Sequence, residues 1–342
     1  MRILIITDTH GDIEQINEAI ERSGADACIH CGDFGFYDEK SPERLTDREL
    51  FLRVKHSHLP HSIRKRSRKM NRTELVETIR AEGLLSGLTP YLEGEKHFLA
   101  PVYAVWGNHE DIEVVRALRD GEKHIENLHM VDEAHPFSLA QGVRLVGIGG
   151  NFYQEGKGLF ASDMTGKGGK VRASWLQYAR LLCQELERPK DDQFTIFVGH
   201  VSPGKVRLLE RYSLVLGARL AVFGHMDPPI THAYSLFTIC EPDEAMARSQ
   251  AEFDALRHRW DEEKSQGEWT PEEIEWIEKS FQALDVPHFP RRERGSRPKK
   301  GSVEERYFTT QFLNVADAPE GWAVLEMGER KAHLETHSQW RL

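Results

Sequence analysis

Cysteine is scarce in this sequence, with four residues in 342, at positions 28, 31, 183 and 240. That density is too low for a disulfide-stabilised scaffold, so this class of protein is excluded. Cys28 and Cys31 have the C-x-x-C spacing of redox and zinc sites, but they lie inside an apolar run typical of a β-strand. We therefore expect them to be buried structural residues.

Long apolar runs are also missing. None approaches the roughly 20 residues that a membrane-spanning helix needs, so we expect no membrane association. The first apolar segment ends before Asp8 and is too short for a signal peptide. Hydrophobic residues make up 39% and charged residues 29%, as in soluble globular proteins. A cytoplasmic location is the resulting expectation, and the sequence leaves the oligomeric state open.

The chain lacks a positive net charge, which argues against general attraction to nucleic acid. Its net charge is -10, and an acidic protein repels a polyanion on average. Two segments depart from this average. Residues 55–72 contain seven Lys or Arg, three His and no acid, and residues 291–300 contain six Lys or Arg against Glu293. Local basic segments of this kind bear on the choice of substrate.

The order of apolar and polar segments predicts one α/β domain. A strand at 2–7, a helix at about 12–23 and a strand at 27–31 form a βαβ unit. Further strands are expected at 102–106, 143–148, 194–198, 219–223, 308–315, 322–327 and 331–336. We predict a single domain over 1–342 whose parts are a basic helical insertion at 38–98, a helical insertion with a basic linker at 241–305, and C-terminal strands at 306–342 that return to the core.

Five polar clusters follow five of the apolar runs. They read Asp8-Thr9-His10, Gly32-Asp33, Gly107-Asn108-His109-Glu110, Gly199-His200 and Gly224-His225-Met226-Asp227. Each alone is an ordinary loop, helix cap or turn. If the preceding strands lie in one parallel sheet, their carboxyl ends share the edge where such sheets bind ligands. Five clusters in this order therefore indicate a common site.

The residue types in these clusters suit a pair of divalent metal ions. Such ions take carboxylate oxygens, amide oxygens and neutral imidazole nitrogens, and a two-metal site needs one carboxylate to bridge ions about 3.5–4 Å apart. Asp8, Asp33, Asn108 and the histidines supply all three kinds of ligand. We expect Mn²⁺, with Fe²⁺, Mg²⁺ and Zn²⁺ as alternatives.

The series D-x-H, G-D, G-N-H-E, G-H and G-H resembles the calcineurin-like metallophosphoesterases, over about 1–40, 100–150 and 190–240. The resemblance implies an α/β/β/α sandwich of two mixed sheets flanked by helices, with two largely helical insertions. It also implies hydrolysis of a phosphoester by a metal-bridging hydroxide. By this resemblance, Asp8 and His10 would bind the first metal, Asp33 would bridge the two metals, and Asn108, His200 and His225 would bind the second. His109 would act as the general acid and would be oriented by Glu110.

One position departs from the family pattern. The last motif of the family ends in a second His that binds the first metal, and this chain has Asp227 there. We expect Asp227 to be a ligand, because an anionic oxygen suits a hard divalent ion. The alternatives are that Asp227 points away and leaves the first metal weak or absent, or that His232 replaces it.

Within the family, local motifs are most similar to the lariat debranching enzymes, which hydrolyse 2′,5′-phosphodiesters at RNA branch points. The similar segments are Cys31-Gly32-Asp33-Phe34, Gly94-Glu95-Lys96, Ala100-Pro101-Val102, Gly142-Val143-Arg144 through Gly150, and Thr310-Gln311-Phe312-Leu313. Debranching enzymes typically carry Cys where this chain has Asp8. In them an insertion at the place of 38–98 contacts RNA, so the predicted substrate-binding residues are Arg64, Lys65, Arg66, Arg68 and Lys69.

Two classes of function remain open. The first is a metal-dependent phosphodiesterase acting on RNA, branched RNA included, or on a nucleotide, with a phosphomonoesterase or protein phosphatase as the other enzyme. The second is a non-catalytic module that binds a partner on the same fold. The intact Asn108-His109-Glu110 motif favours the enzyme, because a binding module needs no general acid. For the basic run, the alternative is a solvated helix face paired with nearby acids.

Overall fold

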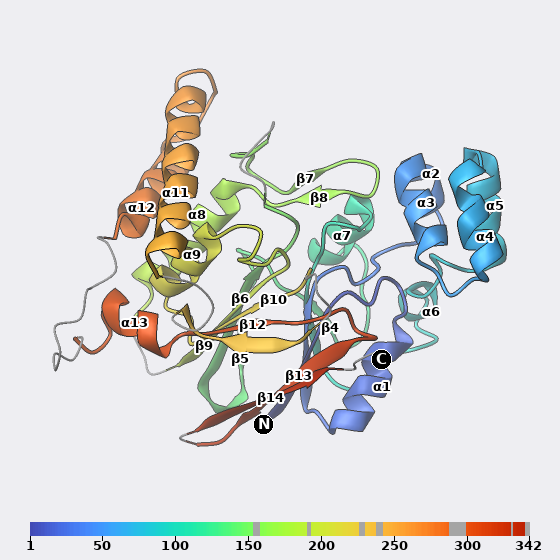
Figure 1. Cartoon of the computed structure of the whole chain (residues 1–342), viewed down its shortest axis with the longest axis horizontal. Coiled ribbons are helices and arrows are strands. Elements are labelled where there is room, and N and C mark those ends of the chain that lie inside the picture. Colours follow the sequence, from blue (N-terminus) through green and yellow to red (C-terminus); the bar gives the residue numbers. More distant parts are fainter. Residues whose placement is uncertain are drawn as a thin grey trace.

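The computed structural model describes residues 1–152, 158–189, 193–225, 230–236, 242–286, 299–329 and 331–338. Two six-stranded sheets form its centre, and helices cover them (Figure 1). Among the described residues, no helix has the length and apolar character needed to cross a membrane. The fold is thus α/β with two mixed sheets flanked by helices, as predicted.

The first sheet has the strand order β14-β13-β1-β2-β3-β4. Its members are β1 (Arg2–Ile6), β2 (Ala27–Cys31), β3 (Val102–Val105), β4 (Leu128–Met130), β13 (Gly321–Met327) and β14 (Ala332–Ser338). Strands β1 to β4 are parallel, and β13 and β14 extend the sheet in antiparallel pairing. Helix α1 (Glu14–Ser23) connects β1 to β2 and ends at Gly24, whose left-handed φ of 60° lets the chain turn back.

The second sheet has the order β11-β12-β10-β9-β6-β5. Its members are β5 (Phe137–Leu139), β6 (Val143–Ile148), β9 (Phe194–Gly199), β10 (Leu220–Phe223), β11 (His232–Tyr234) and β12 (Gln311–Asn314). The four central strands are parallel and the two outer ones antiparallel. Strand β12 starts later than predicted because helix α13 (Val303–Thr309) precedes it.

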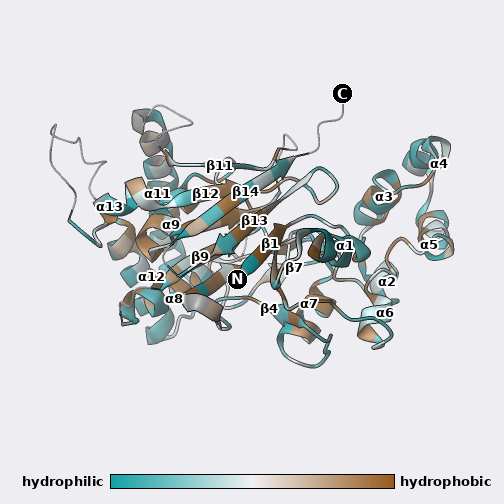
Figure 2. Cartoon of the chain, turned by 90° about the horizontal axis from the view of Figure 1, so that it is seen from below, coloured by the Kyte–Doolittle hydropathy of each residue, from teal (hydrophilic) through white to brown (hydrophobic). Residues whose placement is uncertain are grey.

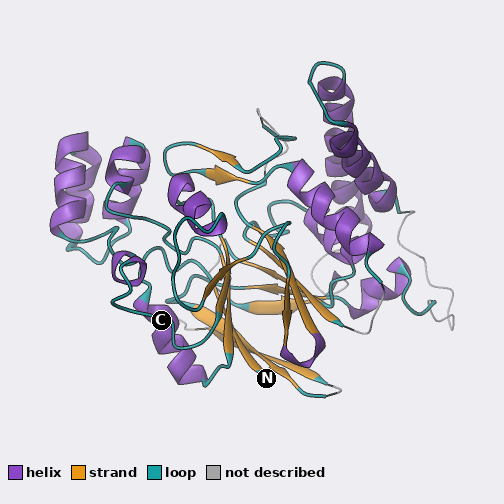
Figure 3. Cartoon of the chain, turned by 180° about the vertical axis from the view of Figure 1, so that it is seen from behind, coloured by secondary structure: helices purple, strands orange, loops and turns teal. Residues whose placement is uncertain are grey.

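Successive side chains of each strand point to opposite faces of the sheet and so pack into two different layers. In β1, Ile3 and Ile5 pack between the sheets against residues such as Ile196 of β9, whereas Leu4 and Ile6 face the layer that contains α1. Helix α7 (Ile112–Arg119) packs in that same outer layer. Helices α8 (Trp175–Glu187) and α9 (Leu208–Leu216) pack against the outer face of the second sheet. The result is a four-layer sandwich of helices, two sheets and helices (Figure 3).

The five strands that precede the polar clusters do not share one sheet, contrary to the simplest expectation. Strands β1, β2 and β3 belong to the first sheet, and β9 and β10 to the second. A strand that is buried on both faces shows no alternation of apolar and polar residues. Its sequence therefore does not indicate to which sheet of a sandwich it belongs. Because the two sheets are stacked, the carboxyl ends of these strands still converge.

Residues between β2 and β3 form short helices. They are α2 (Ser41–Arg44), α3 (Asp47–Lys55), α4 (His61–Arg66), α5 (Arg72–Ala81) and α6 (Thr89–Leu92). Helices α3 and α5 enclose a small core of their own, which includes Leu50, Val54, Leu75 and Ile79. Hydropathy colouring shows α3 and α4 as largely hydrophilic and β1 as hydrophobic (Figure 2).

A second helical pair lies at the opposite end of the molecule (Figure 1). Helices α11 (Pro242–Lys264) and α12 (Pro271–Leu284) pack on α8 and α9 through Phe253, Trp260 and Phe281. Helix α12 begins at a capping box, in which Thr270 and Glu273 satisfy each other's backbone N–H groups. Most of the basic linker expected around 291–300 lies outside the described residues.

Candidate metal centre and its cleft

Four residues of the polar clusters have an unusual backbone conformation. Asp8, His10, Asp33 and His225 have φ between 50° and 55°, and only one other non-glycine residue in the described chain, Asn127, has a positive φ. The strained turns are held in place because the N–H of Asp8 donates to the carbonyl of Gly32 at 2.9 Å and that of His10 to Asp33 at 2.8 Å. Such strain persists where the surrounding structure enforces it, commonly at functional sites.

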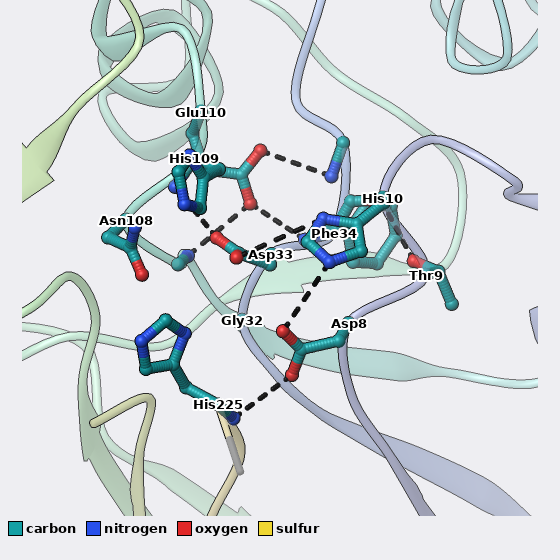
Figure 4. A network of polar contacts seen from close by, with 12 residues as sticks. Asp8, Thr9, His10, Gly32, Asp33, Phe34, Asn108, His109, Glu110 and His225 are labelled. Carbon is teal, nitrogen blue, oxygen red and sulfur yellow. Dashed lines mark hydrogen bonds and ion pairs between the residues drawn. The ribbon is translucent and has the colours of Figure 1, made fainter. Parts of the chain in front are cut away.

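These turns bring four candidate ligands together. One ligand atom from each of Asp8, Asp33, His200 and His225 lies within 4.8 Å of the others. Asp8, Asp33 and His200 are buried, and His225 is half-buried. Figure 4 shows Asp8 and Asp33 on one side of the cluster, with Asn108 and His225 facing them. The donor set of two carboxylates and two imidazoles suits a divalent cation.

His200 is oriented so that a lone pair faces the centre. Its Nδ1 donates to the carbonyl of Cys31 at 2.9 Å, which leaves Nε2 unprotonated. That atom lies 3.0 Å from Asn108 Oδ1 and 3.6 Å from Asp33 Oδ1. Lone pairs from three side chains therefore converge, an arrangement that a bound cation stabilises. A backbone contact of this kind also fixes the ring of a metal-binding histidine.

The two aspartates are electrostatically different. Burial, together with the nearby carboxylates of Asp33 and Asp317, raises the pKa of Asp8 well above its usual value. Burial acts the same way on Asp33, but His200, His10 and His109 outweigh it and lower the pKa of Asp33. Asp33 Oδ2 is buried without a hydrogen-bond partner in the described structure. A buried carboxylate with an unpartnered oxygen beside a second carboxylate fits a bridging metal ligand.

The histidines near the two aspartates are held neutral. Burial lowers the pKa of both His10 and His225 to about 3, so each ring keeps a lone pair at neutral pH. His10 Nε2 lies 3.7 Å from Asp8 Oδ1, and its Nδ1 lies 3.9 Å from Asp33 Oδ2. His10 therefore sits within reach of both carboxylates, although it is outside the group of four.

The remaining predicted ligand, Asp227, lies outside the described residues. The alternative ligand, His232, does lie within them, on β11. Its Nδ1 donates to the carbonyl of Ile230 at 3.0 Å, and its Nε2 lies 3.4 Å from Asn314 Nδ2. Both ring nitrogens are thus engaged away from the cluster, so the structure does not support a swap of His232 for Asp227.

The predicted acid His109 stands beside the cluster, but Glu110 does not orient its ring. The Glu110 carboxylate accepts backbone N–H groups from Phe34 and Phe36 at 2.7 Å, Gly35 at 3.1 Å and Gly107 at 3.3 Å. Burial and the charge of Asp33 raise the pKa of Glu110 to about 8, against the lowering effect of those amides. Glu110 therefore joins the loops after β2 and β3, and the expectation that it contacts His109 is corrected.

Glu49 of α3 contacts the His109 ring instead. Its Oε2 lies 2.7 Å from His109 Nδ1. Burial lowers the pKa of His109, but the hydrogen bond to Glu49 and the charge of Asp33 outweigh it, so the net shift is upward. No short motif marked Glu49, because it lies 60 positions from His109 in the sequence.

A cleft of about 1110 Å³ opens over the site. Asp8, His10, Asp33, His109 and His225 line it, and further residues of both charges surround them, the acids being Asp12, Asp317 and Glu320. The lining cations and histidines are Arg53, His56, His58, Arg64 and Lys205. The sequence had indicated only Arg64 among them. Arg53, Lys205 and the acid Asp317 went unrecognised because each lies in a loop or helix without a motif.

The five predicted substrate-binding residues lie on α4 and the turn that follows it. Arg64 lines the cleft, whereas Lys65, Arg66, Arg68 and Lys69 are exposed and are not among its lining residues. Within the described part of the chain, none of the five forms an ion pair with an acid. Arg72, at the end of the same basic run, does pair with an acid, its guanidinium lying 2.6 Å from Asp47 Oδ1.

The chain belongs to the calcineurin-like phosphoesterase family, whose model matches residues 1–229. That match covers every polar cluster. No curated protein matches the chain. One solved structure resembles it over 98% of this chain and 99% of its own, with 12% sequence identity and a TM-score of 0.47. Similarity at that level carries no argument about function.

Proposed function

We propose that this protein is a divalent-metal-dependent phosphodiesterase that acts on nucleic acid, RNA and branched RNA included, or on a nucleotide. Family membership supports a phosphoester hydrolase. The observation that carries the proposal is the group of Asp8, Asp33, His200 and His225, with His109 beside it in a cleft that Arg53, Arg64 and Lys205 also line. A pure binding module has no use for that combination of ligands and acid.

Each residue then has a role in the reaction. Asp8, Asp33, His200 and His225 would hold the cations, together with the nearby His10 and Asn108 and with the predicted ligand Asp227. When bound, the cations supply Lewis acidity toward the phosphoryl oxygens and a nucleophile at neutral pH. The Nδ1 of His109 is hydrogen-bonded to Glu49, so its Nε2 is the atom that can protonate the departing alkoxide.

The charges around the cleft support an extended anionic substrate. Arg53, Arg64 and Lys205 line the walls, and four further cations continue along α4 and the following turn. A net charge of -10 would repel a polyanion, so this local basic region is what makes nucleic acid a reasonable substrate. The local motifs similar to debranching enzymes point the same way, whereas Asp8 at their cysteine position argues for the usual two-metal ligand set.

Turnover of two matched chromogenic esters tests the proposal. Protein loaded with Mn²⁺ should hydrolyse bis-p-nitrophenyl phosphate faster than p-nitrophenyl phosphate. Turnover of a linear and of a branched oligoribonucleotide then shows which kind of RNA diester the protein hydrolyses. Asp33→Asn prepared in parallel controls for contaminating phosphatases. A preference for the monoester would indicate a phosphomonoesterase or protein phosphatase. No turnover of any ester would favour a non-catalytic module.

A further inference from the structure

The helical segment between β2 and β3 places one buried acid at the reaction centre. Glu49 is the third residue of α3, and its side chain is 1% exposed. Its backbone N–H donates to Oγ1 of the helix-capping residue Thr46 at 3.3 Å. The start of α3 thus fixes the backbone of Glu49 while its carboxylate reaches the His109 ring at 2.7 Å.

A glycine turn holds Glu49 from the other side. Strands β7 (Thr165–Gly166) and β8 (Val171–Arg172) are joined by a turn whose Gly168 carbonyl accepts the N–H of Thr46 at 3.0 Å. A Cβ atom added at Gly169 would lie 2.8 Å from Glu49 Cγ. The turn therefore packs directly on the Glu49 side chain, which leaves it little freedom to leave His109.

The His109 backbone is fixed as tightly as its ring. Its N–H donates to Asp33 Oδ1 at 2.7 Å, and its carbonyl accepts a hydrogen bond from the Tyr37 hydroxyl. With Nδ1 directed at Glu49, the ring has one orientation, and Nε2 is the nitrogen that remains for a substrate. This is the arrangement by which an acid fixes both the tautomer and the direction of a catalytic histidine.

We propose that Glu49 is the positioning residue of His109, and that the segment carrying α3 is for this reason part of the catalytic apparatus as well as a substrate-binding arm. This inference rests on the proposed function. Glu110 cannot fill the role because backbone amides occupy both of its oxygens. The same helix continues to Arg53, whose guanidinium donates to the carbonyl of His10 at 3.2 Å, so α3 contacts the site at two points.

The test is the dependence of turnover on the leaving group in Glu49→Gln. A poor alkoxide leaving group needs protonation, whereas p-nitrophenolate departs with little help. We expect kcat on an alkyl phosphodiester or oligoribonucleotide to fall ~10–100-fold. The loss on bis-p-nitrophenyl phosphate should be several-fold smaller, with KM and metal content unchanged. Asp47→Asn, an exposed acid on the same helix, is the matched control and should behave as wild type.

A structural role for Glu49 predicts a different result. Loss of a buried ion pair would lower the melting temperature and reduce both activities by the same factor, and that outcome overturns the proposal. So does wild-type kcat on both substrates in a folded Glu49→Gln. If Glu49→Gln does not fold, Gly169→Ala keeps the carboxylate but displaces it, and it must show the same leaving-group dependence. Failure of the wild type on every phosphoester would instead refute the proposed function.

Discussion

Asp33 accepts the backbone N–H of His109 at 2.7 Å through Oδ1, while its Oδ2 is buried without a hydrogen-bond partner in the described structure. One carboxylate thereby links the loop after β2 to the loop after β3. It also keeps a lone pair directed at the group formed with Asp8, His200 and His225. The spacing between the candidate metal site and the candidate acid is therefore set by Asp33.

Asp33→Asn should abolish the stabilisation of the protein by metal. Burial and Asp33 together raise the pKa of Asp8, which shows that the two acids disfavour each other's charge. Removing one charge relieves that repulsion but also removes a carboxylate whose pKa His200, His10 and His109 lower, so the metal-free protein should melt at or below the wild-type temperature. In wild type, Mn²⁺ at 100 times Kd should add about 2.7 kcal/mol of stability. Melting curves with and without Mn²⁺ measure both effects.

The control for this variant is Asp12→Asn, an exposed acid that also lines the cleft. Asp12→Asn should keep the full stabilisation by Mn²⁺. An Asp33→Asn protein that still gains stability from Mn²⁺ would contradict the assignment of Asp33 as a ligand.

His109→Ala should lower turnover ~10²–10⁴-fold, the range expected for loss of a general acid. Metal content should remain at the wild-type level, because the His109 ring contacts Glu49 rather than the four-residue group. Elemental analysis by mass spectrometry, run beside the kinetic assay, separates these effects. His200→Ala is the comparison variant and should lose metal. Loss of metal from His109→Ala would reassign His109 as a ligand.

The placement of candidate ligands at strand ends was predictable from the sequence, whereas contacts between distant segments were not. Asp8 and Asp33 stand directly after short buried runs, so the sequence alone places them at strand ends. Glu49 lies on a helix that carries no motif, and only the packing of α3 brings it to His109. Glu110 was misread for the same reason, since its partners are the backbone amides of residues 34–36.

Asp227 remains a predicted ligand, because it lies outside the described residues. Asp227→Ala should reduce bound metal from two equivalents toward one, since the first cation would keep only Asp8, His10 and the shared Asp33. Asp227→His should retain two equivalents and shift the preference toward Zn²⁺, because a nitrogen replaces an anionic oxygen. Calorimetric titration with Mn²⁺ and Zn²⁺ measures both. Unchanged affinity in Asp227→Ala would show that Asp227 does not coordinate.

Neutralising the basic run should weaken RNA binding and flatten its salt dependence. The variant replaces five residues with Gln: Arg64, Lys65, Arg66, Arg68 and Lys69. Each lost contact to a single-stranded phosphate should reduce the slope of log K against log salt by about 0.7. Fluorescence anisotropy with a labelled oligoribonucleotide at several salt concentrations measures the slope, using Asp33→Asn in both backgrounds to prevent cleavage.

A matched control for that variant carries Gln at Arg257, Arg259 and Lys264 of α11, at the other end of the molecule (Figure 1). It should retain the affinity and slope of the parent protein. Effects in proportion to the charges removed, five in the first variant and three in the control, would mean that net charge alone governs binding. An unchanged slope in the first variant would remove the role assigned to its segment.

His30 should make the metal-free protein sensitive to acid. Its Nδ1 accepts the N–H of Gly32 at 3.2 Å, and its Nε2 lies 3.0 Å from Thr9 Oγ1, so the ring is held neutral. Burial lowers the pKa of His30 from 6.5 to about 3. Between pH 6.5 and about 3 the unfolded chain binds more protons than the folded protein. The contribution of His30 to the free energy of unfolding is therefore full above pH 6.5 and declines as the pH falls toward 3.

His30→Gln should therefore lose less stability on acidification than wild type. Each unit of pH below 6.5 costs about 1.4 kcal/mol for one such histidine, until the folded-state pKa is reached. Urea unfolding at intervals from pH 7 to pH 4, with a chelator present, gives the slope. The variant retains part of the acid sensitivity, because His10 and His225 are also held neutral by burial. His258→Gln, at an exposed position on α11, should keep the wild-type slope, and the same slope in His30→Gln would contradict the neutral buried state of His30.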